Sequence, residues 1–187
     1  EFAGYLRQVS FKNTTITVKD QLSGQHWKMP NAQLNVRRTD LGLLMNLTGD
    51  IGVADTNLMP LDLSVIFNNA KQEAVALLNF SELRASALAG KVEALAGLSE
   101  IDIPAKGNIE LTIDRDFVIP HIAFTLALGE GTFNAQQIYQ QPLQASSAAL
   151  NGYIQKRENA IILDEISVKL GQTDIKGSGL LYATLET

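Results

Sequence analysis

The sequence predicts a mainly β protein, in which a long, antiparallel and strongly twisted sheet folds into a half-open groove with one short Leu/Ala-rich helical insert. Two observations support this prediction. Apolar residues recur at every second position, which places them on one face of a pleated strand. Short turn-forming sequences separate these segments and favour antiparallel neighbours. The alternating apolar residues are Leu34, Val36, Leu43, Met45, Leu47, Leu61, Leu63, Val65, Phe67, Ile109, Leu111, Ile113, Phe124, Leu126 and Leu128.

The first part of the chain is typical of a meander of short strands. We expect turns at Leu22–Gly24, Met29–Asn31, Thr39-Asp40, Gly49-Asp50 and Asn68-Asn69, because Gly, Pro, Asn, Asp and Ser favour turn conformations. The predicted strands are Tyr5–Phe11, Thr14–Asp20, Gln25–Met29, Asn31–Arg38, Leu41–Gly49, Pro60–Asn68 and Lys71–Asn79.

The pattern changes at about residues 81–98, which are rich in Ala and Leu. Leu83, Ala87, Val92 and Leu95 lie at roughly helical spacing, and Ser81 is a candidate N-cap. This insert is either a lid or partner-binding helix, or a helical plug over one end of the sheet, and we favour the plug.

Strands resume after Ile103-Pro104. The predicted strands are Gly107–Asp114, Val118–Leu128, Gly131–Gln136, Pro142–Gln155, Ala160–Leu170 and Thr173–Thr184. Asn151-Gly152 is a strong hairpin dipeptide, yet the residues around it resemble one continuing strand. We therefore expect a bulge or bend at Gly152.

Composition excludes several classes of function. The 187 residues carry a net charge of −5, and the basic residues are scattered, so there is no electrostatic footprint for nucleic acid. Cysteine is absent, which excludes disulfides, thiolate metal sites and cysteine nucleophiles. No apolar run approaches the ~18–20 residues of a membrane-spanning helix. Strand-like sequence begins almost at once after Glu1, so we interpret residues 1–187 as a single β-rich segment of a larger protein.

No constellation of residues predicts catalysis, a metal site or a cofactor. Asp114 and Asp116 belong to a predicted turn, and Asp164 and Glu165 should point to opposite faces of one strand, so neither pair forms the facing carboxylates of general acid–base chemistry. The two histidines have no further ligand at metal-site spacing. We expect a protein that is not an enzyme.

The sequence also shows a family resemblance. Residues 9–36, VSFKNTTITVKDQLSGQHWKMPNAQLNV, contain an apolar strand ending in Asp, a turn with Gly, a strand with an aromatic residue and a third strand. An I-x-x-P-x-x-G-x-I element follows the insert at residues 101–109. This order of elements resembles the AsmA-like proteins, particularly the YhdP-type branch and its relative TamB.

The resemblance implies a β-taco-like segment of an inner-membrane-anchored protein that extends through the periplasm of the Gram-negative envelope. Phospholipid would be its ligand, and the alternating apolar residues, derived from periodicity, would shelter the acyl chains. Two alternatives stay open. Those residues could be a core sealed by a second sheet, or the chain could be an assembly scaffold whose sheet edges accept a strand from an outer-membrane partner.

Overall fold

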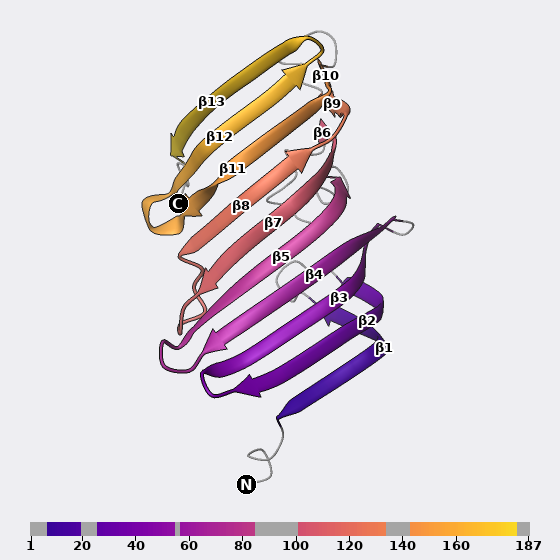
Figure 1. Cartoon of the computed structure of the whole chain (residues 1–187), viewed down its shortest axis with the longest axis vertical. Coiled ribbons are helices and arrows are strands. Elements are labelled where there is room, and N and C mark those ends of the chain that lie inside the picture. The colour runs from indigo at the N-terminus through magenta and orange to yellow at the C-terminus, as the bar shows by residue number, and fades with distance from the viewer. Residues whose placement is uncertain (1–6, 20–25, 55–56, 85–100, 134–142, 183–187) are drawn as a thin grey trace.

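The computed structural model describes residues 7–19, 26–54, 57–84, 101–133 and 143–182. It confirms the predicted class, since these residues form an open antiparallel sheet with ten strands in the order β1-β2-β3-β4-β5-β7-β8-β11-β12-β13. Each strand of this sheet pairs with the strands next to it in the order, so the twisted sheet grows as one meander (Figure 1). The strands are β1 (Gln8–Lys19), β2 (His26–Thr39), β3 (Gly42–Ala54), β4 (Asn57–Asn68), β5 (Glu73–Arg84), β7 (Pro104–Ile113), β8 (His121–Leu128), β11 (Ser147–Gln155), β12 (Ala160–Leu170) and β13 (Thr173–Tyr182).

Hairpin loops connect the strands along one side of the sheet, where the strands end, and we call this side the hairpin edge. Its loops comprise residues 40–41, 69–72, 114–120 and 156–159. Side chains cap these loops, as predicted for their sequences: Asn68 Oδ1 accepts bonds from the N–H groups of Ala70 (2.9 Å) and Lys71 (3.1 Å). Asn159 closes a short 3-10 turn in the left-handed conformation, with φ of 48°. The hairpin loops therefore set the register of the sheet.

At the opposite edge, β1 and β2 bend sharply. Each strand carries one bulge, at Asn13 and Asn31, whose φ angles are 53° and 55°. Asn tolerates this left-handed conformation better than most residues, and Pro30 needs no ladder hydrogen bond in a bulge. The segments beyond the bend, 14–19 and 26–32, turn behind the sheet (Figure 1), and we call them the flap.

The flap covers one end of the sheet. A Cβ atom added to Gly49 of β3 would lie 3.1 Å from the Met29 side chain and 3.2 Å from the Ala32 Cα. Both flap residues are buried, with 5% and 0% of their surfaces exposed. Gly49 thus permits the close approach of the flap to β3.

Three middle strands are interrupted at this same bent edge. Short strands β6 (Ile101–Asp102), β9 (Gly131–Phe133) and β10 (Leu143–Ala145) form a second sheet in the order β10-β9-β6. This order repeats that of their longer neighbours β11, β8 and β7. The short sheet is therefore a bent continuation of the same meander.

Several sequence predictions need correction. Each of the first two pairs of predicted strands is one long bent strand, so Met29–Asn31 is a corner and not a turn. Gly49-Asp50 lies inside β3, and Ser81 lies inside β5 instead of capping a helix. The remainder of the predicted helical insert, residues 85–98, lies outside the described residues, as does the turn at Leu22–Gly24.

The predicted continuation of one strand through Asn151-Gly152 is confirmed, and Gly152 lies opposite a bulge whose extra residue belongs to β12. The β11–β12 register shifts between Asn151 and Gly152, and β11 continues through both residues. A Cβ atom on Gly152 would overlap the carbonyl oxygen of Ile162, which explains why glycine occupies this position.

Candidate functional site

The pairing register places all fifteen alternating apolar residues on one face of the sheet. Cα partners in an antiparallel ladder project their side chains to the same face, so a row of partners can be followed from strand to strand. Leu34 is the partner of Leu47, which is the partner of Leu63. We call this surface the apolar face.

Four rows and one flanking residue contain the fifteen predicted positions. The first row is Leu34, Leu47, Leu63, Leu78, Ile109, Phe124, Gly152 and Leu163. The second is Val36, Met45, Val65, Ala76, Leu111, Ile122, Ile154 and Ile161. The third, at the hairpin edge, is Arg38, Leu43, Phe67, Ala74 and Ile113. The fourth is Gly49, Leu61, Phe80, Gly107, Leu126, Leu150, Ile166 and Gly177, and Leu128 lies beyond it.

Sequence reasoning therefore missed part of the apolar face. Leu78, Ile122, Leu150, Ile154 and Ile161 belong to the same rows as the predicted residues. The period-two pattern that identified the fifteen predicted residues is also present in these strands, but alanine or glycine occupies some of the alternating positions on the apolar face. The site extends across the sheet to β13, further than predicted.

The apolar face is not sealed like the core of a β-sandwich. None of the fifteen residues is buried, and Leu43 is 45% exposed. Among the described residues, no large side chain is completely buried. The inward residues of a sandwich would be packed from both sheets, so the half-exposed state of these side chains differs from that of a closed core.

The dimensions of the apolar face suit an extended apolar ligand. Along β3, six residues separate Leu43 from Gly49, which corresponds to about 20 Å at about 3.3 Å per residue. Across the ten strands the face spans about 43 Å, at about 4.8 Å per strand spacing. The footprint of the sheet over this span is on the order of 900 Å².

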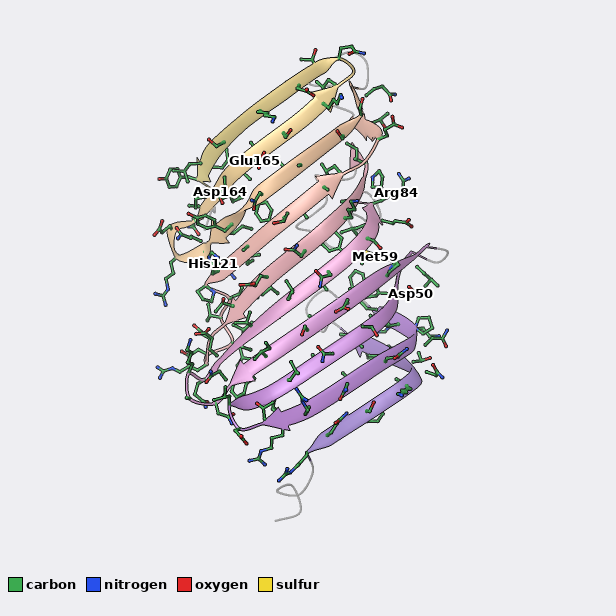
Figure 2. The ribbon with its side chains drawn as sticks, viewed as in Figure 1. Asp50, Met59, Arg84, His121, Asp164 and Glu165 are labelled. Atoms are coloured by element: carbon green, nitrogen blue, oxygen red, sulfur yellow. The ribbon has the colours of Figure 1, made fainter. Side chains whose placement is uncertain are left out.

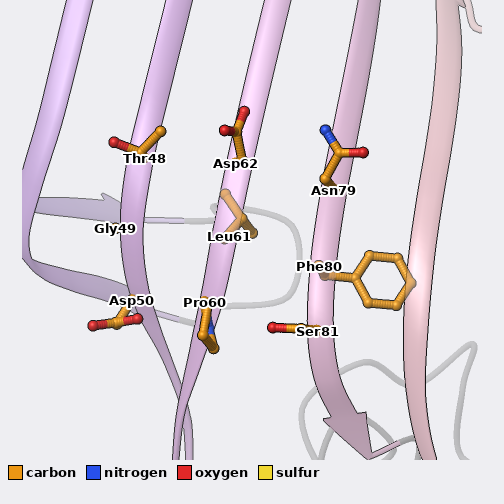
Figure 3. A pocket seen from close by; sticks show the side chains of 9 residues that line it. All are labelled: Thr48, Gly49, Asp50, Pro60, Leu61, Asp62, Asn79, Phe80 and Ser81. Atoms are coloured by element: carbon orange, nitrogen blue, oxygen red, sulfur yellow. The ribbon is translucent and has the colours of Figure 1, made fainter.

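Two Phe residues lie opposite glycines on this face. Phe80 is the cross-strand partner of Gly107, and Phe124 is the partner of Gly152. Phe80 is only 8% exposed, and Figure 3 shows its ring directed toward the neighbouring strand. Aromatic side chains of this kind replace the packing that a strand glycine lacks.

The opposite face of the sheet is largely polar. Ser64 donates a hydrogen bond of 2.9 Å to Asn46 Oδ1, and Thr125 donates one of 3.5 Å to Asn151 Oδ1. A shallow hollow of about 420 Å³ lies across β3, β4 and β5 and is lined by residues of both faces: Thr48, Asp50, Pro60, Asp62, Asn79 and Ser81, together with Gly49, Leu61 and Phe80 of the fourth row (Figure 3).

The carboxylates considered for catalysis form no facing pair. Asp114 Oδ1 accepts bonds of 2.9 Å from the N–H groups of Asp116 and Val118, so it organises its loop. A bulge in β12 lies at Asp164 and Glu165. The residues on either side of it, Leu163 and Ile166, both belong to rows of the apolar face. Glu165 is the cross-strand partner of Asn151 on the polar face, Asp164 has no ladder partner, and both carboxylates are exposed (Figure 2).

Within the described parts of the chain, no group of three or more His, Asp or Glu side chains is arranged to hold a metal ion. The described residues also contain no helix of the length and apolarity needed to cross a bilayer. Comparison of the chain with known protein families, curated proteins and solved structures found no match.

Proposed function

We propose that this chain shelters phospholipid acyl chains on its apolar face. The observation that carries the proposal is the continuous, half-exposed aliphatic surface formed by the four rows. Burial of apolar surface is favourable by about 25 cal/mol per Å² and has no directional requirement. A surface of Leu, Ile and Val therefore holds an acyl chain through many weak contacts, none of which fixes it at one position.

This mode of binding suits transport better than storage. The acyl chain would lie on the apolar face while the headgroup remains in water at the hairpin edge. Because each contact is weak and similar to the next, a lipid can move along the apolar face from one set of side chains to the neighbouring set. We propose, on the resemblance to AsmA-like proteins, that the parent protein is anchored in the inner membrane and conducts phospholipid across the periplasm toward the outer membrane.

The test is extraction of the purified protein with organic solvent, followed by mass spectrometry of the extract. We expect co-purified phospholipid from the wild type and much less from the Leu63→Asp or Leu126→Asp variant. Ile66→Asp is a matched control, because Ile66 is 57% exposed on the opposite face of β4, the strand that carries Leu63. Folded wild-type protein that carries no lipid would contradict the proposal.

A scaffold function is the alternative, and the exposure of β13 favours it. All residues of this outer strand are exposed, including Leu181 at 54% and Tyr182 at 71%. An outer strand presents unpaired backbone groups that can accept a strand from a partner. Ile175→Pro and Lys176→Pro are two separate variants. Of these neighbouring residues, one directs its backbone N–H toward β12 and the other directs it away from the sheet, so one of the two variants removes an N–H that a partner strand would use. Under this alternative, that variant should abolish partner binding. Under the lipid proposal, lipid recovery persists in both variants.

A further inference from the structure

Two arginines end the apolar face at the hairpin edge. The Arg38 N–H donates a 2.8 Å bond to the Arg7 carbonyl oxygen, which continues the β1–β2 register beyond the Gln8–Arg37 pair. Arg38 is also the cross-strand partner of Leu43 on β3. Alternation along the two strands therefore places the Arg7 and Arg38 side chains on the same face as Val9 and Val36.

Among the residues that the structure describes, the two guanidinium groups have no counter-ion. Like charges directly opposite each other on neighbouring strands are destabilising. Within the described residues, neither side chain forms an ion pair or hydrogen bond, although the chain as a whole is acidic, with a net charge of −5. An anionic ligand would relieve this repulsion.

The pair borders a cavity that is lined by both polar and apolar residues. The cavity has a volume of about 380 Å³. Its lining includes Arg7, Arg38 and Asn69, together with Val9, Val36 and Leu43. A free anion would meet only the polar lining, whereas an amphiphile with an anionic group would meet both.

We propose that Arg7 and Arg38 bind the phosphate group of a phospholipid whose acyl chains lie on the apolar face. Guanidinium groups present a planar set of donors that matches phosphate oxygens in a bidentate arrangement. From Arg38 the apolar face runs six residues along β2 to the flap at Ala32, about 20 Å at about 3.3 Å per residue. That length accommodates an acyl layer, which is about 15 Å, half the thickness of a bilayer core. This inference rests on the proposed function and adds the headgroup class to it.

The test compares three soluble probes with the full chain by isothermal titration calorimetry. They are dihexanoyl phosphatidic acid, dihexanoylglycerol and inorganic phosphate. We expect the phosphatidic acid to bind at least about tenfold more tightly than dihexanoylglycerol, because one charge-assisted hydrogen bond is worth about a decade in affinity. Inorganic phosphate should bind more weakly than phosphatidic acid.

The double variant R7Q/R38Q removes both charges from exposed positions and should reduce phosphatidic acid binding to the level of dihexanoylglycerol. Arg37→Gln is the matched control, since Arg37 lies next to Arg38 but on the polar face of β2, and this variant should bind all probes as the wild type does. Unchanged phosphatidic acid binding by R7Q/R38Q, or an equal loss in Arg37→Gln, would overturn the proposal. Equal affinity of the wild type for inorganic phosphate and phosphatidic acid would also overturn it, by showing a site for free phosphate only.

The Met45→Asp variant separates this inference from the proposed function, because Met45 lies one strand and two residues away from Arg38 on the apolar face, within reach of a six-carbon chain. If it loses affinity for dihexanoylglycerol while R7Q/R38Q leaves phosphatidic acid binding intact, the apolar face binds acyl chains and the headgroup assignment is wrong. If Met45→Asp leaves both lipids bound as in the wild type, the proposed function fails, and the headgroup proposal that rests on it fails as well.

Discussion

A carboxylate at the centre of the apolar face should disrupt lipid binding far more than it disrupts folding. Leu63 lies in the first row, between its cross-strand partners Leu47 and Leu78. All three side chains are half-buried, so an aspartate at position 63 reaches water at the surface of the sheet. The same aspartate would lie against the acyl chain of a bound lipid.

The expected magnitude follows from the contact that is lost. About three methylene groups of an acyl chain cover one leucine, and each buried methylene contributes about 0.8 kcal/mol. The loss is then about 2.4 kcal/mol, or about a 50-fold decrease in affinity. Ile66→Asp removes a side chain of similar size from the opposite face and should leave the affinity unchanged.

The assay is a fluorescence titration of a phospholipid that carries a probe on its acyl chain. Urea unfolding of each variant, monitored by circular dichroism, supplies the control for folding. If Leu63→Asp binds the lipid as tightly as the wild type, or if Ile66→Asp loses the same affinity, the assignment of the apolar face to lipid is wrong.

Three further predictions concern the fold, and urea denaturation measures each of them. Phe80→Ala should lower the free energy of unfolding by about 3 kcal/mol, because the ring is nearly buried opposite Gly107; a loss below about 1 kcal/mol would show that the ring does not pack there. Gly152→Ala should lower it by more than about 2 kcal/mol, since the added methyl group overlaps the Ile162 carbonyl oxygen, and wild-type stability would refute that conflict. Asp114→Ala removes the acceptor of two loop N–H groups and should cost about 1–2 kcal/mol; an unchanged midpoint would mean that the loop holds without it.

Period two was sufficient to predict the face on which each apolar residue lies, because alternation is a local property of a strand. The rows that join these residues depend on register, which the hairpin loops set. The sequence at Asn68-Asn69 predicts its loop correctly, and the side-chain caps show why.

The bends could not be predicted by the same reasoning. Asn13, Pro30 and Asn31 have turn chemistry, and the local sequence does not distinguish a reversal of the chain from a bulge in a continuing strand. Whether such residues form a turn or a bulge depends on whether the two paired strands bend at the same place, and this cannot be read from either strand alone.

Sequence reasoning also missed the arginine pair. Arg38 follows Leu34 and Val36 in strict alternation, so its face could have been predicted. The position of Arg7 opposite Arg38 could not, because it requires the β1–β2 register across two bulges, one in each strand.

The most direct test of the central claim is photo-crosslinking of this protein in intact cells. A photoreactive amino acid is placed at Leu63 or Leu126 on the apolar face, and at Ile66 on the opposite face as the control. We expect phospholipid adducts at Leu63 and Leu126 and none at Ile66. Adducts of equal yield on both faces, or only protein adducts at Leu63 and Leu126, would contradict this claim.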